Sequence, residues 1–189
     1  MKTLLITGFE PFDGGAVNPS WEAVKLLPDT VGDYRLCKLN IPTVYAAAAE
    51  TVCAKARQIG ADAIICVGQA GGRDAITPER IAVNIRDARI ADNAGRLCRG
   101  ERIAADGPAA YFSTLPVEKM SQAIRDVRIP SSVSNTAGCY VCNDVLYTVL
   151  HANIAPACFI HVPYLPEQGT PNLALETVCQ ALIAAIEVL

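Results

Sequence analysis

Charged residues and long apolar runs are scarce in this sequence, and each scarcity excludes a class of function. Charged residues make up 19% of the 189 positions, and the formal net charge is −3. Because no run concentrates arginine or lysine, we expect no nucleic-acid partner. Because no run reaches about 18 apolar residues, we expect no membrane span and no membrane partner. The apolar N-terminus stops at Glu10 and Pro11 without a cleavage site, which favours a first strand over a signal peptide.

Cysteine, by contrast, is abundant, and its placement indicates a compartment. The chain has eight cysteines. Five of them lie within apolar strand or helix patterns, as small hydrophobic residues do: Cys37, Cys53, Cys66, Cys158 and Cys179. A disulfide framework is typical of shorter, secreted chains. We therefore expect a protein of the reducing cytoplasm.

Strand and helix patterns alternate along nearly the whole chain. Buried or alternating apolar runs predict strands at residues 3–7, 34–41, 63–67, 80–85 and 157–162. Helical spacing and capping residues predict helices at residues 19–27 and 43–59, and from about 116, 140 and 172. Residues 92–114 are polar and rich in Gly and Arg, which predicts a long surface excursion. No repeat or linker divides the chain, so we expect one domain over residues 1–189.

This order of elements predicts an α/β fold. Its central sheet should be mostly parallel, with one antiparallel excursion and with helices on both faces. Ligands of such sheets bind outside the carboxyl ends of the strands. We therefore expect four features to gather at that edge: the loop from Phe9 to Phe12, the loop that carries Gln69, Cys142 and His161.

Residues 131–143 are typical of the approach to a catalytic nucleophile. A short β-branched run leads into a turn signal at residues 135–138, and helical spacing begins near Tyr140. Cys142 then falls in the first turn of a helix, where unpaired N–H groups and the helix dipole lower the pKa of a thiol. A strand, a glycine turn and a helix that starts with a nucleophile form a nucleophile elbow, here with cysteine in place of serine. The alternative is a buried structural cysteine.

A cysteine nucleophile needs a base, and the chain has two histidines. His151 ends the helix that Cys142 begins, and nine residues at about 1.5 Å each separate the two by roughly 13 Å. His161 lies near the carboxyl end of a predicted strand and is the better base by elimination. The acid that would orient its ring stays open among four candidates: Asp74, Glu79, Asp87 and Asp92.

Short blocks that run in order over nearly the whole chain carry a resemblance to a known family. They are GFEPF (8–12), NPSW (18–21), GQAGGR (68–73), ITPERIAVN (76–84), DARI (87–90), GPAAY (107–111), TAG (136–138), YVCN (140–143) and FIHVPYLPEQ (159–168). With these blocks the chain resembles the type I pyroglutamyl peptidases, also called pyrrolidone carboxyl peptidases.

The resemblance implies a cysteine peptidase that removes N-terminal pyroglutamate (5-oxoproline) from peptides, with no metal or other cofactor. It also implies a three-layer α/β/α fold, a cytosolic location and a homotetramer. By the same matching, Cys142 is the nucleophile, His161 the base and Glu79 the orienting acid. The pocket for the lactam ring would be lined by Phe9, Phe12, Thr43, Gln69, Tyr140 and Val141.

The sequence departs from the family pattern at Asp13, Ala91 and Cys139, where glycine, proline and threonine are usual. Cys139 and Cys142 form a C-x-x-C pair, which makes a thiol–disulfide oxidoreductase the alternative function. A zinc site is weaker, because one C-x-x-C and one histidine supply too few ligands. A dinucleotide site at residues 68–73 is excluded, because the glycine spacing is not G-x-G-x-x-G and no helix is expected to follow.

Overall fold

A six-stranded sheet forms the centre of the molecule in the computed structural model, which describes all of residues 1–189. Its strand order is β2-β3-β1-β4-β8-β5. The strands are β1 (Lys2–Phe9), β2 (Thr30–Val31), β3 (Tyr34–Ile41), β4 (Ala63–Gln69), β5 (Thr77–Glu79) and β8 (Ala157–Val162). The four central strands run parallel, and the edge strands β2 and β5 are antiparallel to their neighbours. The expected α/β fold with a mostly parallel sheet is confirmed.

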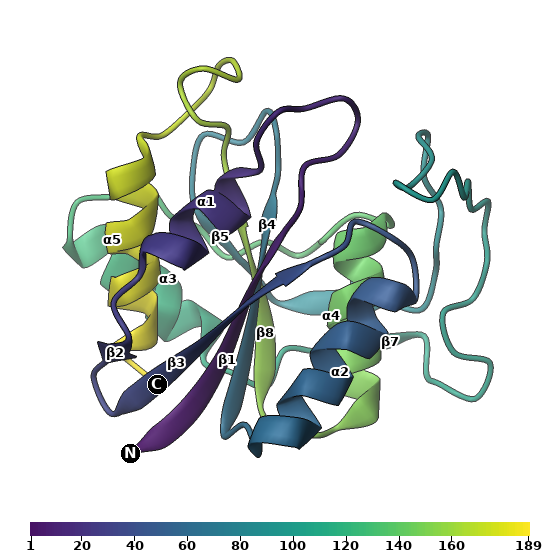
Figure 1. The fold of residues 1–189 in the computed structure, drawn as a ribbon, viewed down its shortest axis with the longest axis horizontal. Helices are drawn as coiled ribbons and strands as arrows, with labels where there is room; N and C mark the ends of the chain where they lie inside the picture. Colours follow the sequence, from purple (N-terminus) through teal and green to yellow (C-terminus); the bar gives the residue numbers. More distant parts are fainter.

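Helices cover both faces of this sheet, so the three expected layers are present (Figure 1). One face carries α1 (Pro19–Leu26), α3 (Val117–Asp126) and α5 (Leu175–Ile186), and the other carries α2 (Ala47–Ile59) and α4 (Val141–Ala152). Along β1, Leu4 and Ile6 pack into the core under the three helices, whereas Leu5 packs into the core under the two. Because both faces are covered, the inner strands β1, β4 and β8 are largely apolar and almost wholly buried.

Local signals account for the ends of the helices. Asn18 caps α1, since its Oδ1 accepts a hydrogen bond from the backbone N–H of Ser20 at 3.1 Å. Gly60 ends α2 in the left-handed conformation, with φ at 59°. The predicted start of α2 at residue 43 is wrong: Ala46 has a φ of 62°, and the helix begins only at Ala47. The last helix likewise begins at Leu175 rather than near residue 172.

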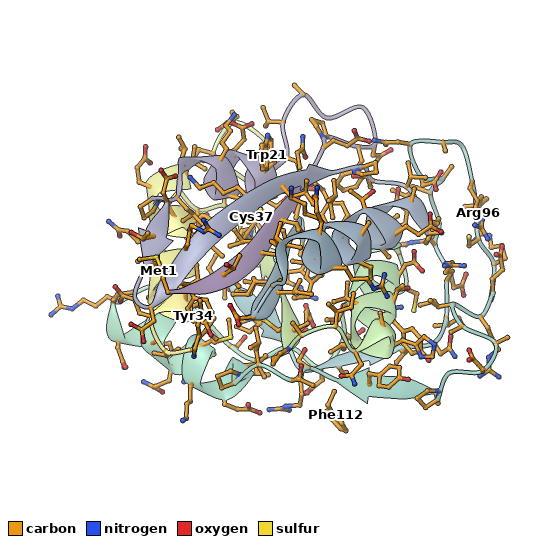
Figure 2. All side chains as sticks on the ribbon, turned by 60° about the horizontal axis from the view of Figure 1, so that its bottom comes forward. Met1, Trp21, Tyr34, Cys37, Arg96 and Phe112 are labelled. Carbon is orange, nitrogen blue, oxygen red and sulfur yellow. The ribbon has the colours of Figure 1, made fainter.

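The strand predicted at residues 80–85 is confirmed in its centre, but it is shorter than predicted and does not join the central sheet. β5 ends at Glu79 on the central sheet, while β6 (Ile81–Val83) pairs antiparallel with β7 (Ala110–Phe112) in a separate two-stranded sheet. The predicted surface excursion is also only partly exposed, since Asp92 and Cys98 are buried. At its far end Phe112 is 67% exposed and points away from the body of the protein (Figure 2).

Residues 131–134 do not form the strand that the predicted nucleophile elbow requires. They make only isolated bridges, from Ser131 to Ile76 and from Ser134 to Glu79. Their partner β5 is three residues long, too short to pair with a full strand. The rest of the prediction is confirmed: Gly138 turns the chain with a φ of 75°, and α4 begins directly after Tyr140.

The carboxyl ends of β1, β4 and β8 meet at one edge of the sheet, as predicted. Phe9 ends β1 and Gln69 ends β4, and both lie at a cavity that Cys142 also lines. His161 lies one residue before the end of β8, opposite Gly68 of β4. None of the helices combines the length and the apolar character needed to cross a membrane.

Candidate active site

Two antiparallel strands bring Glu79 and His161 together in the protein interior. His161 lies in β8 between Gly68 of β4 and Thr77 of β5. Glu79 ends β5, and its Oε1 lies 2.7 Å from Nδ1 of His161. Glu79 is 0% exposed and His161 is 4% exposed. Because Nδ1 faces the carboxylate, Nε2 is the ring nitrogen left for a reacting proton.

Arg73 binds the same carboxylate from the other side. Its Nη1 lies 2.6 Å from Oε1 of Glu79 and also contacts Oγ1 of Thr77. Its Nη2 donates to the carbonyl of Thr136 at 3.0 Å, in the segment that leads to α4. One guanidinium therefore joins the loop after β4, the acid on β5 and the approach to Cys142.

Burial and charge act against each other on the Glu79–His161 pair. Burial by itself raises the pKa of Glu79, but the hydrogen bond and the charge of His161 and the hydrogen bond from Arg73 bring it below the usual 4.5. Burial lowers the pKa of His161 below 6.5, an effect that Glu79 opposes and Arg73 reinforces. At neutral pH the carboxylate is ionised and the imidazole is neutral, which is the state that a general base requires.

Cys142, the second residue of α4, lies next to this pair. A β-carbon added to Gly68 would come within 3.1 Å of its Sγ, and Gly68 is the strand neighbour of His161. Glycine at this position therefore leaves the sulfur room beside the histidine. No hydrogen bond joins the sulfur to the imidazole, whose one bond goes to Glu79. Such catalytic contacts are often long before a substrate binds and shorten in the complex.

Buried polar contacts hold the start of α4 in place. The Asn143 side chain exchanges two hydrogen bonds of 2.9 Å with the backbone of Val83. Asp144 accepts from the N–H of Ala46 at 2.8 Å and pairs with Arg86 at 2.7 Å. Asn143 and Asp144 are both 0% exposed, so these bonds are shielded from water. They tie the first turn of α4 to β6 and to the start of α2.

The expectation that the start of the helix lowers the pKa of Cys142 is wrong. Burial raises the pKa of this thiol to about 12, and the carboxylate of Glu79 adds to the rise. Arg73 and the thiol's own backbone N–H act in the opposite direction but do not outweigh burial. The thiol is therefore neutral at pH 7 and needs a base to become a nucleophile. The backbone N–H groups of Val141 and Cys142 have no acceptor in the helix and are open to an anion.

A small, uncharged cavity of about 30 Å³ opens beside Cys142. Its walls combine aromatic rings with amide and hydroxyl groups, and they are Phe9, Phe12, Asn18, Thr43, Gln69, Tyr140 and Cys142. The rings of Phe12 and Tyr140, which both line it, are tilted by 41° to each other with centroids 6.0 Å apart. All of the residues expected to line the lactam pocket, except Val141, thus surround one cavity at the sulfur.

The chain matches the family model described as pyroglutamyl peptidase over residues 1–189. The chain belongs to the pyroglutamyl peptidase family. It is 48% identical over 194 residues to the pyrrolidone-carboxylate peptidase of Staphylococcus saprophyticus, with 97% of this chain and 91% of that protein covered. For the pyrrolidone-carboxylate peptidase of Levilactobacillus brevis the identity is 49% over 193 residues, with 97% and 95% covered.

Solved structures of pyroglutamyl peptidases have the same fold. The pyroglutamyl peptidase I of Bacillus amyloliquefaciens superposes with a TM-score of 0.95 at 42% identity, covering 99% of this chain and 96% of that one. The pyrrolidone carboxyl peptidase of Thermococcus litoralis also reaches 0.95, at 37% identity, covering 100% and 93%. The family resemblance carried by the sequence motifs is confirmed.

Val141 is the one expected pocket residue of this pyroglutamyl peptidase that does not line the cavity. Its side chain is 0% exposed and packs in the core under α2 and α4. As the first residue of α4 it turns only backbone toward the site. Asn18 lines the cavity instead, although the sequence indicated only its role as a helix cap.

The other titratable candidates lie elsewhere in the family fold. Asp92 shapes a turn by accepting backbone N–H groups, and Asp74 is exposed. Asp87 lines a different cavity. His151, at the far end of α4, has its Nδ1 2.8 Å from the hydroxyl of Tyr111. Of the four acids left open by the sequence, only Glu79 contacts His161.

The C-x-x-C pair is not arranged as a redox site. Cys142 lines the cavity beside His161, whereas Cys139 lines the cavity that contains Asp87 and Arg89. Burial raises the pKa of Cys139, so it is not an activated thiol either. No cluster of three or more His, Cys, Asp or Glu side chains is placed to hold a metal ion.

Arg73 is the residue of the site to which the sequence assigned no role. Its bond to Glu79 spans six positions and depends on β5 turning back against β8. A signal was nevertheless present, because Arg73 ends a glycine-rich loop at the carboxyl end of a buried strand. Side chains at that edge of a parallel sheet commonly contact ligands or catalytic groups.

Proposed function

We propose that this family member removes N-terminal pyroglutamate from peptides, with Cys142 as nucleophile, His161 as base and Glu79 as the acid that orients it. The observation that carries the proposal is the buried Glu79–His161 pair, set across Gly68 from a cysteine that opens onto an uncharged cavity. Pyroglutamate has neither a free amine nor a side-chain carboxylate. A pocket without charge suits that ring and rejects ordinary, charged N-termini.

Aromatic walls and an amide select the lactam. The rings of Phe12 and Tyr140 supply apolar walls for it, and Gln69 lies at the same cavity, where its amide can exchange hydrogen bonds with the lactam N–H and C=O. The cavity of about 30 Å³ equals the volume share of about one water molecule, less than a five-membered ring needs. Phe12 lies on the partly exposed loop after β1, so it is the wall that moves when the ring enters.

The reaction starts with a neutral thiol and a neutral imidazole. Nε2 of His161 takes the proton of Cys142 as the sulfur attacks the carbonyl carbon of pyroglutamate, and a C–S bond forms. Glu79 stabilises the imidazolium that results. The backbone N–H of Cys142, which has no acceptor of its own, meets the developing oxyanion.

His161 then returns the proton. The C–N bond breaks as Nε2 protonates the leaving amine, and the shortened peptide departs from a thioester on Cys142. A water molecule next loses a proton to Nε2 and attacks the thioester carbonyl. The C–S bond breaks, the sulfur regains its proton, and free pyroglutamate leaves.

A chromogenic pyroglutamyl anilide tests the proposal directly. The wild type should release pyroglutamate and the anilide dye, and Cys142→Ala should release neither, because no other group forms the acyl-enzyme. Cys139→Ser is the matched control and should keep its activity. Reduction of insulin disulfides by the wild type, without cleavage of the anilide, would favour the oxidoreductase instead.

The family resemblance also supports a cytoplasmic homotetramer. Buried cysteines such as Cys66 and Cys158, placed as ordinary core residues, suit a reducing compartment. Sedimentation equilibrium at several protein concentrations measures the assembly, and a single monomer mass throughout would contradict the tetramer.

A further inference from the structure

We propose that the cavity between the loop after β1 and the loop after β8 receives the residue that follows pyroglutamate, and that it favours a basic side chain there. This inference rests on the proposed function and adds a substrate preference to it. The cavity has a volume of about 400 Å³, enough for one amino-acid side chain and its backbone. Its walls are Phe12, Asp13, Gly15, Ala16, Val17, Gln69, Tyr164, Glu167 and Gln168.

This cavity adjoins the lactam pocket. Phe12 and Gln69 line both spaces, so a peptide can extend from one into the other past these two side chains. Hydrogen bonds hold the Gln69 side chain in place. Nε2 of Gln168 donates to Oε1 of Gln69 at 3.0 Å and to the carbonyl of Val17 at 3.2 Å. The two loops that form the cavity are thus tied to the residue that meets the substrate ring.

The position of His161 indicates which way the leaving peptide points. Its Nε2 protonates the leaving amine, so that amine and the residue attached to it lie on the side of His161. The chain that continues from His161 through β8 supplies Tyr164, Glu167 and Gln168 to the cavity. Nothing precedes an N-terminal pyroglutamate, so the peptide occupies the substrate site on this side only.

The charge of the lining predicts the preference. Asp13 and Glu167 are the two charged residues among the walls, and no lysine or arginine lines the cavity. The nearby Arg73 is engaged by Glu79. A lysine or arginine after pyroglutamate gains from both carboxylates, and an aspartate or glutamate is repelled.

A second cavity provides the opposite prediction. It lies beyond Tyr140 and is lined by Asp87, Arg89, Arg99 and Cys139, among others. If the leaving peptide occupied that cavity, its two arginines would favour acidic residues. The sign of the charge preference therefore decides between the two cavities.

The expected effect is modest, because both carboxylates are exposed. An exposed ion pair contributes about 0.2–1 kcal/mol, which corresponds to about a 1.4- to fivefold change for each carboxylate. We expect kcat/KM for a peptide with lysine after pyroglutamate to exceed that for glutamate by at least about fivefold at low salt. At 1 M salt the screening length falls to about 3 Å, and the preference should largely disappear.

The experiment compares peptides pyroglutamyl-X-alanine amide, with X as lysine, glutamine or glutamate, and uses the pyroglutamyl anilide as a substrate without a side chain. In the double variant Asp13→Asn, Glu167→Gln, the rates for lysine and glutamate should come within about twofold of each other. Thermal unfolding of that variant should match the wild type, which reports an intact fold. Asp33→Asn is the matched control, because Asp33 is exposed and lies at the amino end of β3, whereas the site lies at the carboxyl ends of the strands.

Each other result overturns the inference. Equal rates for lysine and glutamate in the wild type, or a lysine preference that survives in the double variant, would show that these carboxylates do not contact the peptide. A glutamate preference that Arg99→Gln removes would place the peptide in the second cavity. Failure to cleave the anilide overturns the proposed function itself, whereas cleavage of the anilide without charge preference overturns only the subsite.

Discussion

The two ends of α4 each lie near a histidine with a carboxylate partner, yet their surroundings differ. At the N-terminal end, near Cys142, His161 is buried and its Nδ1 lies 2.7 Å from fully buried Glu79. At the C-terminal end, the side chain of His151 is 33% exposed and its Nε2 lies 3.6 Å from Asp106, which is 87% exposed. A carboxylate partner alone therefore does not show which histidine is the catalytic base.

The two histidines differ in how strongly their contacts hold the ring and in which parts of the structure those contacts join. A polar contact exposed to water is weak and changes geometry easily, whereas a buried hydrogen bond to a carboxylate holds a ring in a single orientation. His151 also packs on Tyr147, with ring centroids 6.1 Å apart, and bonds to Tyr111, so its contacts join α4 to β7. The contact of His161 with Glu79 leaves Nε2 without a protein hydrogen-bond partner.

Replacement of the buried histidine should have the largest effect. His161→Ala should lower kcat/KM for the pyroglutamyl anilide by about 10³-fold or more, because general acid–base catalysis is typically worth 10²–10⁴ and the neutral thiol of Cys142 has no other base. Circular dichroism and thermal unfolding establish that the variant is folded. Retention of more than about a tenth of the activity would remove His161 from the mechanism.

Glu79→Gln should come next, with a loss of about 10²-fold in kcat and little change in KM. Glutamine keeps the shape and a bond to Nδ1 of His161 but does not stabilise the imidazolium. The separate values of kcat and KM measure this split. A wild-type kcat would contradict the assignment of Glu79, and Asp87, which lies in another cavity, is then the next acid to replace.

Much of this site could be predicted from the sequence, since Cys142, His161 and Glu79 lie in family motifs and at the ends of apolar runs. The contact between Glu79 and Arg73 could not, because it depends on the separation of β5 and β6 into different sheets. The sequence around residues 77–83 does not show that β5 and β6 pair with different strands, because tertiary packing decides which strand each one pairs with. The raised pKa of Cys142 was missed for a related reason: a helix start is visible in the sequence, whereas the burial that outweighs it is not.

Arg73 is a further difference between the two histidines, because its guanidinium binds the carboxylate partner of His161, and no arginine binds the carboxylate partner of His151. The guanidinium lowers the pKa of His161, so Arg73→Gln should raise that pKa. The base works when neutral, and burial keeps the pKa of His161 below 6.5 in the wild type. The acid limb of kcat/KM should therefore lie below pH 6.5 in the wild type and move to higher pH in Arg73→Gln.

Arg73→Lys retains the charge and serves as the matched variant. It should return the acid limb toward the wild-type position even if the loss of the contact to Thr136 lowers the rate. A role limited to holding the loop would lower the rate in both variants and leave the pH profile of both unchanged. We expect a loss of about tenfold in kcat for Arg73→Gln at pH 7, since one positioning contact is removed.

The smallest effect should follow replacement of the other histidine. His151→Ala removes a hydrogen bond to Tyr111, which contributes about 1 kcal/mol to the free energy of unfolding, and a partly exposed contact with Asp106. The start of α4 keeps its own contacts through Asn143 and Asp144, so the position of Cys142 should not change. Activity on the anilide should stay within about twofold of the wild type, while denaturant unfolding shows the small loss of stability. Loss of activity in His151→Ala, together with an active His161→Ala, would exchange the roles of the two ends of α4.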